Sequence, residues 1–340
     1  MTIKIETIGV VGAGAWGSAL ASAAGRAGRS VVLQAHEPEV AEVINAVHEN
    51  LLFLPGVPLD PNVRATTDLS EVAACDAVLL VTPAQFLRAV TTEMAKFWRP
   101  GVPAVICSKG IELKSGALMS EVVADTLGAV APLAVLSGPT FAREVAEGLP
   151  TAVTLACPNA ALGKALADAL GTPRFRIYRS HDLIGAEIGG AVKNVLAIAC
   201  GIVEGRDMGD NARAALITRG LSEIVRIAVA KGGEAETVSG LAGLGDLTLT
   251  CNAMQSRNFS LGVALGEGAS LSDVLSERRS VAEGVHSAAA VSALAKSLGV
   301  DAPICAAVDK ILNGNADIDA TIIDLMARPV GPEGRRDDGG

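Results

Sequence analysis

A chain of 340 residues with a formal net charge of −9 is too long for one efficient hydrophobic core and too acidic for the basic face that nucleic-acid binding requires. We therefore expect two domains, no nucleic-acid partner, and anionic ligands held by a few local lysines or arginines. Half of the residues are hydrophobic but only 3% are aromatic, which favours helices packed on a sheet through small aliphatic side chains.

The sequence also argues against membrane insertion and secretion. Charged residues interrupt the longest apolar stretch, residues 184–203, so no uncharged run reaches the roughly 20 residues that span a bilayer. The first six residues lead into a strand pattern without the features of a signal peptide. Six widely spaced cysteines without a C-x-x-C pair suit buried hydrophobes in a reducing compartment better than a metal site. We expect a cytoplasmic protein.

In chain order, short β-branched runs alternate with helical stretches, which is the signature of an α/β, Rossmann-type parallel sheet domain. The expected strands are residues 7–11, 30–35, 77–82, 104–107, 134–136, 151–155 and 174–178. After residue 181 helical periodicity dominates, so an all-α C-terminal domain follows. We place the sheet domain at residues 1–182, the helical domain at 183–328 and a disordered tail at 329–340, where Pro, Gly and charges leave little to bury.

The first expected strand runs into Gly12-Ala13-Gly14-Ala15-Trp16-Gly17, and an alanine-rich helical stretch follows. In such a loop the first glycine permits the tight turn, the second lets a pyrophosphate approach the backbone, and the third lets the helix pack close to the strand. The phosphates would lie at the helix N-terminus, whose N–H groups and dipole favour an anion. This context predicts a dinucleotide cofactor; an ordinary turn is the competing interpretation.

The end of the second strand bears on the choice between NAD and NADP. NAD-selective proteins usually carry an acid there, about 20 residues after the loop. Here the strand runs into Gln34, and His36 could offer a donor to a 2′-phosphate. Glu37 favours NAD instead, or is a helix first-turn acid. We expect NADP or NAD, with NADPH slightly favoured.

Two later strand ends carry candidate ligands, because ligands of an open α/β sheet lie outside the carboxyl ends of the strands. Lys109 follows the strand at 104–107 and is either a substrate ligand or a solvated surface lysine. Gly138 and Thr140 follow the strand at 134–136 and either bind a ligand or form an ordinary turn and cap.

Lys193 lies in a stretch, residues 188–198, that is apolar nearly all round. Complete burial lowers a lysine pKa by roughly 3 to 5 units, which suits a group that exchanges a proton near neutral pH. A dehydrogenase needs such a group, because hydride arrival at a carbonyl carbon leaves an alkoxide to be protonated. We assign Lys193 this role; the alternative is a lysine whose stem is buried and whose ammonium reaches solvent.

Downstream, the glycine-rich residues 240–247 lack the strand that a nucleotide loop needs. We expect them to pack closely and deliver Asp246 to a crevice beside Lys193, unless Asp246 is a surface-turn residue. Thr250 could share a helical face with Asp246. Arg257 has a planar fork suited to two phosphate oxygens, and Ser256 and Asn258 flank it with further donors.

With these segments in order, the chain resembles the soluble, bacterial-type NAD(P)-dependent glycerol-3-phosphate dehydrogenases from about residue 5 to residue 326. Beyond the glycine loop, the motifs that carry the resemblance are Ser108-Lys109-Gly110-Ile111-Glu112, Ser137-Gly138-Pro139-Thr140-Phe141-Ala142-Arg143-Glu144-Val145, Ala191-Val192-Lys193-Asn194, Gly243-Leu244-Gly245-Asp246-Leu247 and Gln255-Ser256-Arg257-Asn258. Ala15 stands where the family often has serine, and His36 stands where arginine is common.

The resemblance implies hydride transfer between NAD(P)(H) and the pair sn-glycerol 3-phosphate and dihydroxyacetone phosphate, supplying glycerol 3-phosphate for phospholipid synthesis. We also expect a homo-oligomer, a dimer, because the helical half is rich in alanine and has few charges on some faces. The resemblance further implies three sets of site residues. The catalytic set is Lys193, Lys109, Asp246, Asn194 and Thr250. The substrate-binding set is Lys109, Gly138, Thr140, Lys193, Asp246, Ser256, Arg257 and Asn258. The cofactor-binding set is Gly12, Gly14, Ala15, Trp16, Gly17, His36, Lys109, Ala142, Arg257, Val281 and Glu283.

Two other functions stay open from the residues alone. A β-hydroxyacid dehydrogenase would use Arg257 to bind a carboxylate in place of a phosphate. A nucleotide sensor whose helical half binds a partner protein is the second, although a sensor has no reason to desolvate Lys193 beside Asp246.

Overall fold

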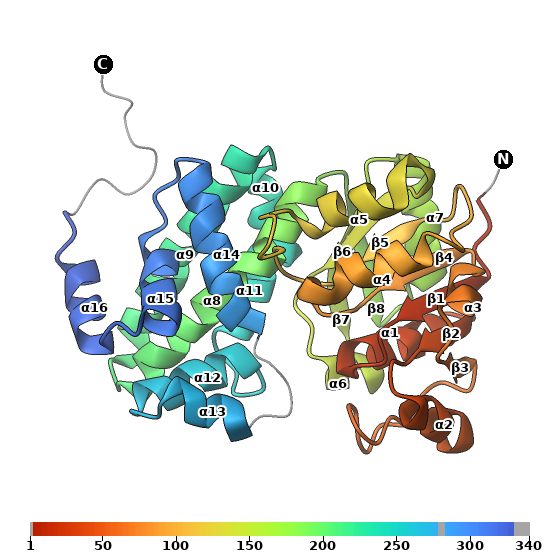
Figure 1. Cartoon of the computed structure of the whole chain (residues 1–340), viewed down its shortest axis with the longest axis horizontal. Helices are drawn as coiled ribbons and strands as arrows, with labels where there is room; N and C mark the ends of the chain where they lie inside the picture. Colours follow the sequence, from red (N-terminus) through yellow and green to blue (C-terminus); the bar gives the residue numbers. More distant parts are fainter. Residues whose placement is uncertain (1–2, 278–282, 330–340) are drawn as a thin grey trace.

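A computed structural model of the chain describes residues 3–277 and 283–329. An eight-stranded sheet with helices on both faces occupies the first half, and a group of helices lies beside it (Figure 1). From Leu183 onwards the described residues form helices and their connections. The expected fold class, a Rossmann-type sheet followed by an all-α region, is confirmed.

The sheet has the strand order β3-β2-β1-β4-β5-β6-β7-β8. Its strands are β1 (Thr7–Val11), β2 (Ser30–Gln34), β3 (Val63–Thr66), β4 (Ala77–Leu80), β5 (Ala104–Ile106), β6 (Leu133–Ser137), β7 (Thr151–Ala156) and β8 (Phe175–Ser180). The order of the strands reverses between β1 and β4, so a crevice opens outside the carboxyl ends of these two strands. A ligand is expected there.

Two features of the sheet differ from the sequence-based expectation. The edge strand β3 was not predicted, because it has only four residues and one of them is the exposed Arg64. The β6–β7 pair is antiparallel, whereas the other neighbouring pairs are parallel. Its connection contains only the five-residue helix α6 (Ala142–Ala146), which does not carry the chain back across the sheet.

Two hydrophobic clusters cover the two faces of the sheet. One face packs against α1 (Ala15–Arg26), α2 (Pro38–Val47), α6 and α7 (Ala160–Leu170). The other face packs against α3 (Leu69–Ala73), α4 (Leu87–Met94) and α5 (Met119–Leu127). Short 3₁₀ turns, η1 (Ala84–Phe86) and η2 (Gly128–Val130), complete this half. The result is a three-layer sandwich built on small aliphatic side chains.

The second half is built around one long helix, α8 (Leu183–Gly205), whose residues 185–203 are all buried. The surrounding elements are α9 (Gly209–Lys231), α10 (Ala235–Val238), the π-helical turn η3 (Leu241–Gly245), α11 (Asp246–Thr250), α12 (Arg257–Gly266), α13 (Leu271–Glu277), α14 (Glu283–Ser297), α15 (Pro303–Gly314) and α16 (Ile318–Met326). Within the described ranges, α8 alone has the length and hydropathy to cross a membrane, but 94% of that stretch is buried inside the protein. It is the central helix of this half.

One segment of the sheet half enters the core of the helical half. Residues 109–120, here called the crossing segment, leave the carboxyl end of β5 and reach the start of α5. Ile111 and Leu118 pair across an isolated antiparallel bridge, and both side chains are completely buried in the hydrophobic core of the helical half. The two halves therefore share part of their core.

Candidate active site

The glycine loop has the geometry that a bound dinucleotide requires. Gly12 has a φ of +105°, and its N–H donates to the carbonyl oxygen of Gln34 at 3.1 Å. A Cβ on Gly17 would lie 1.8 Å from the Gly12 oxygen, so only glycine lets α1 approach the strand. A Cβ on Gly14 would meet nothing within 4 Å, which leaves open space in front of the loop. Gly14 is also the N-cap of α1 and offers the first N–H groups no side-chain acceptor, as suits a phosphate.

A buried asparagine that the sequence analysis did not single out holds this loop in place. Asn50 is 1% exposed, and its Nδ2 donates to the Ala13 oxygen at 2.7 Å and to Ser18 Oγ at 2.8 Å. Its partners lie more than thirty residues away in the chain, so no local pattern could reveal the contact. The two hydrogen bonds tie the glycine loop and the start of α1 to one buried side chain.

The end of β2 presents His36 to solvent beside the glycine loop. Gln34 is buried and its amide donates to the Ala35 oxygen at 2.9 Å, so it is not directed outward. His36 is exposed, and Glu37 is the N-cap of α2 without a side-chain capping bond. Trp16 is half-buried against the sheet core. His36 is the first exposed residue after β2, next to the strand end whose carbonyl accepts from Gly12 N.

Four of the predicted residues come together in a hydrogen-bonded cluster between the two halves of the molecule. Lys193 Nζ, from α8, donates to Asp246 Oδ1 at 2.7 Å and to Thr250 Oγ1 at 2.8 Å. Lys109 Nζ, from the crossing segment, donates to Asp246 Oδ2 at 2.6 Å and to the Gly138 oxygen at 3.2 Å. We call Lys109, Lys193, Asp246 and Thr250 the lysine cluster.

The lysine cluster is almost dry. Asp246 is fully buried, and Lys193 and Thr250 are 7% and 5% exposed. Burial lowers the pKa of Lys193 to about 8, and the attraction of Asp246 offsets only part of that effect. Two ammonium groups share one carboxylate, so the cluster with both lysines charged carries one net positive charge that an anionic substrate or a developing alkoxide would neutralise.

Glycines bring the cluster together by allowing close backbone packing. A Cβ on Gly190 of α8 would lie 3.0 Å from Ser137 Oγ, and one on Gly189 would lie 2.5 Å from the Ala242 oxygen. Within 240–247, a Cβ on Gly243 would lie 1.9 Å from the Val238 oxygen. These contacts set α8 against both the end of β6 and η3, which delivers Asp246 to Lys193.

The structure places several other predicted residues at helix starts or in contacts between helices. Asn258 Nδ2 donates to Asn194 Oδ1 at 2.9 Å, and Asn258 Oδ1 accepts from Gly284 N at 3.0 Å, so these amides join α8, α12 and α14. Ser256 caps α12, of which Arg257 is the first residue. The remaining predicted positions are Thr140, whose hydroxyl donates to the Gly138 oxygen, Ala142 at the start of α6, Glu283 at the start of α14, and Val281, which lies outside the described residues.

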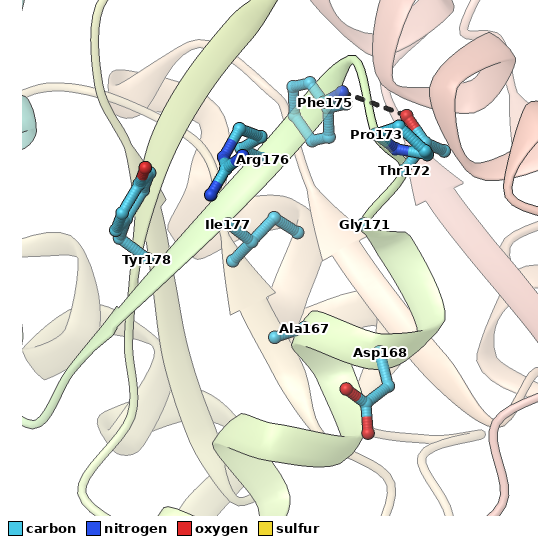
Figure 2. Close-up of a pocket in the computed structure, with 9 residues that line it drawn as sticks. All are labelled: Ala167, Asp168, Gly171, Thr172, Pro173, Phe175, Arg176, Ile177 and Tyr178. Atoms are coloured by element: carbon cyan, nitrogen blue, oxygen red, sulfur yellow. Dashed lines mark hydrogen bonds between the residues drawn. The ribbon is translucent and has the colours of Figure 1, made fainter.

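A surface groove lies elsewhere, at the edge of the sheet between α7 and β8 (Figure 2). It is lined by Ala167, Asp168, Gly171, Thr172, Pro173, Phe175, Arg176, Ile177 and Tyr178. Phe175 N donates to Thr172 Oγ1, and the Arg176 guanidinium lies 5.7 Å from the centre of the Tyr178 ring. The groove contains no member of the lysine cluster or of the glycine loop, so we do not place the reaction there.

A nucleotide-type glycine loop on a doubly wound sheet, together with a desolvated lysine from an all-helical half, is typical of a nicotinamide-dependent dehydrogenase. Residues 7–163 match the N-terminal part, and residues 182–323 the C-terminal part, of NAD-dependent glycerol-3-phosphate dehydrogenase. The chain belongs to this family.

Similar proteins agree with this assignment over nearly the whole chain. The glycerol-3-phosphate dehydrogenase (NAD(P)+) of Rhodospirillum rubrum is 61% identical over 97% of this chain and 95% of the relative. That of Caulobacter vibrioides is 58% identical over 97% of this chain and 100% of the relative. The crystal structure of glycerol-3-phosphate dehydrogenase from Coxiella burnetii has a TM-score of 0.91 at 40% identity, covering 96% of this chain and 100% of that one.

Proposed function

We propose that this chain interconverts sn-glycerol 3-phosphate and dihydroxyacetone phosphate with NAD(P)(H) in the cytoplasm, and so supplies glycerol 3-phosphate for phospholipid synthesis. The observation that carries the proposal is the lysine cluster, in which a buried lysine from one half of the molecule and a second lysine from the other half share the carboxylate of Asp246. Family membership supports the substrate and the cofactor.

The sheet half provides the binding site for the cofactor, which accepts or delivers the hydride when bound. The open space at Gly14 and the uncapped start of α1 fit a pyrophosphate. Beside the loop, His36 is placed for the adenosine ribose or a 2′-phosphate. Further contacts are assigned to Gly12, Ala15, Trp16, Gly17, Lys109, Ala142, Arg257, Val281 and Glu283.

The substrate lies between the lysine cluster and the start of α12. Arg257 binds the phosphate through its planar fork, and Ser256 and Asn258 contribute at the same helix start. Gly138, Thr140 and Asn194 line the site beside the reacting carbon. The positive charge of the lysine cluster and of Arg257 compensates the phosphate in an acidic protein.

The proton is transferred at Nζ of Lys193. In the reduction of dihydroxyacetone phosphate, its ammonium donates a proton to the substrate oxygen as that oxygen gains negative charge. In the oxidation of glycerol 3-phosphate, the neutral amine accepts the hydroxyl proton. A pKa of about 8 leaves both forms accessible near neutral pH. Asp246 and Thr250 orient the amine, and Lys109 stabilises the substrate oxygen.

We assign residues 1–182 to a dinucleotide-binding domain and residues 183–328 to a helical substrate domain. A homodimer is the assembly we assign, because α16 exposes apolar side chains, with Ile323 at 67% and Met326 at 74%. Light scattering of the purified protein tests this assignment, and a monomer at micromolar concentration would contradict it.

The decisive assay follows dihydroxyacetone phosphate reduction with NADH and NADPH in parallel, beside a panel of β-hydroxyacids. We expect turnover of the phosphorylated ketone, with a preference for NADPH. Turnover of hydroxyacids without turnover of dihydroxyacetone phosphate would overturn the proposed substrate.

A further inference from the structure

A buried carboxylate bridges the two domains close to the active site without belonging to the lysine cluster. Glu187 lies in α8 and is 5% exposed. Its Oε1 accepts from Ser120 N at 2.8 Å, and its Oε2 accepts from Ser120 Oγ at 2.5 Å. Ser120 lies in the first turn of α5, where backbone N–H groups need acceptors and the helix dipole favours a negative charge. The helical domain thus caps a helix of the sheet domain.

Each residue of this contact is connected along the chain to a lysine of the lysine cluster. Along α8, Glu187 precedes Lys193 within residues 185–203, which are all buried. Along the crossing segment, Ser120 is joined to Lys109 through Ile111 and Leu118, which are embedded in the helical core. The Lys109–Asp246 ion pair therefore holds the segment to the helical domain at one end, and the Glu187–Ser120 contact holds it at the other. Between them lie the buried Ile111 and Leu118, and beside Ser120 the Lys231–Glu121 ion pair also joins the two domains.

We propose that Glu187 is a positioning residue for catalysis: by holding Ser120, it fixes the crossing segment and with it the placement of Lys109 relative to Asp246 and Lys193. The inference rests on the roles proposed above for Lys109 and Lys193. Paired hydrogen bonds to a carboxylate are directional and short, so they define one position of the segment. Precise placement matters, since a misplacement of about 1 Å from a distant change can cost ~100-fold in rate.

The chain contains a matched control for the structural part of this contact. Glu223, in α9, is 1% exposed and accepts from Ile304 N at 2.7 Å and Cys305 N at 3.1 Å at the start of α15. It is the same kind of interhelical cap, but both of its helices belong to the helical domain. Removing it disturbs a buried cap without touching the crossing segment.

The experiment compares Glu187→Ala, Glu187→Gln and Glu223→Ala by steady-state kinetics of dihydroxyacetone phosphate reduction, cofactor titration and thermal unfolding. We expect Glu187→Ala to lower kcat by about 10-fold or more, with smaller changes, below about threefold, in cofactor Kd and in KM for the ketone. Lys109 is one contact of each ligand, whereas the glycine loop and Arg257 lie on other elements. The pH limb assigned to Lys193 should also shift, since the pKa of Lys193 depends on Asp246 and Lys109.

Glu187→Gln should recover most of the kcat, because its amide oxygen still accepts from Ser120 N and its amide nitrogen can donate to Ser120 Oγ. Glu223→Ala should lower the melting temperature but leave kcat and the pH profile unchanged. Equal kcat values for Glu187→Ala and Glu223→Ala would overturn this inference but leave the proposed function standing. A parent enzyme that does not reduce dihydroxyacetone phosphate would overturn the proposed function, and the inference with it.

Discussion

Replacing Lys193 with methionine removes the amine but retains the length and most of the volume of the side chain. Asp246 keeps its bond to Lys109 at 2.6 Å, so it does not become an isolated buried charge. The structural cost should therefore stay below the roughly 3–5 kcal/mol of breaking a buried ion pair outright. Thr250 still donates to the Asp246 backbone oxygen at 2.6 Å. We expect the variant to fold and to bind cofactor.

Its turnover should fall by at least about 100-fold, the usual effect of removing a general acid–base group, which corresponds to about 2.7 kcal/mol in the activation barrier. The pH dependence of kcat/KM should have opposite signs in the two directions of the reaction. With a pKa of about 8 for Lys193, kcat/KM for ketone reduction needs the ammonium and falls as the pH rises above this value. In the oxidation direction kcat/KM needs the amine and falls as the pH drops below it. The variant should lack both limbs.

The assay records nicotinamide absorbance in both directions across the pH range, with cofactor fluorescence titration and thermal unfolding as controls. Lys109→Met is the companion variant, because it removes the other ammonium from Asp246 and leaves the proposed acid in place. A Lys193→Met enzyme that binds cofactor normally, stays within about tenfold of the parent and keeps its pH limbs would refute the assigned role.

Three further predictions concern the cofactor loop, the phosphate and the buried carboxylate. Gly17→Ala should abolish cofactor binding and lower the melting temperature, because its Cβ would meet the Gly12 oxygen at 1.8 Å. Gly14→Ala should weaken cofactor binding but leave the melting temperature unchanged, because its Cβ would meet no protein atom within 4 Å. Cofactor titration and thermal unfolding check both variants. Arg257→Ala should raise KM for dihydroxyacetone phosphate by at least ~10-fold, the loss of a charge-assisted contact of about 1.5–3 kcal/mol, and an unchanged KM would move the phosphate elsewhere. Burial raises the pKa of Glu187 from 4.5 to about 7; the two hydrogen bonds from Ser120 oppose the shift, as does Lys231, whereas Glu121 adds to it. The folded chain therefore holds an extra proton in this window, and the free energy of unfolding should fall as the pH rises through it. Urea unfolding near both ends of the window should show this slope in the parent and its loss in Glu187→Gln.

Much of the fold could be predicted because its determinants are local. The strands at residues 7–11, 104–107 and 151–155 are short runs rich in apolar and β-branched residues, and their observed bounds differ from the expected ones by at most one residue. The strand β3 was missed because a short edge strand buries too little to leave a pattern. The direction of β7 depends on how far its connection reaches, which periodicity does not encode.

The site was predictable only where a residue type alone implies its chemistry. A lysine in an apolar helix and a glycine-rich loop before a helix are such signals, and they led to Lys193 and to the segment that carries Asp246. The sequence could not show that one carboxylate serves two lysines, since Lys109 and Asp246 are 137 residues apart. Glu187 was read only as a charge interrupting an apolar stretch, because its partner Ser120 lies on another domain.

The shared core has a consequence for how the protein is made. A ribosome releases the sheet half before α8 exists, and at that stage Ile111 and Leu118 have no core to enter. The nascent chain must carry these two apolar side chains exposed, and truncation after residue 182 would make that exposure permanent. We expect such a fragment to self-associate. The nucleotide-binding half therefore depends on synthesis of the catalytic half to bury its own apolar side chains.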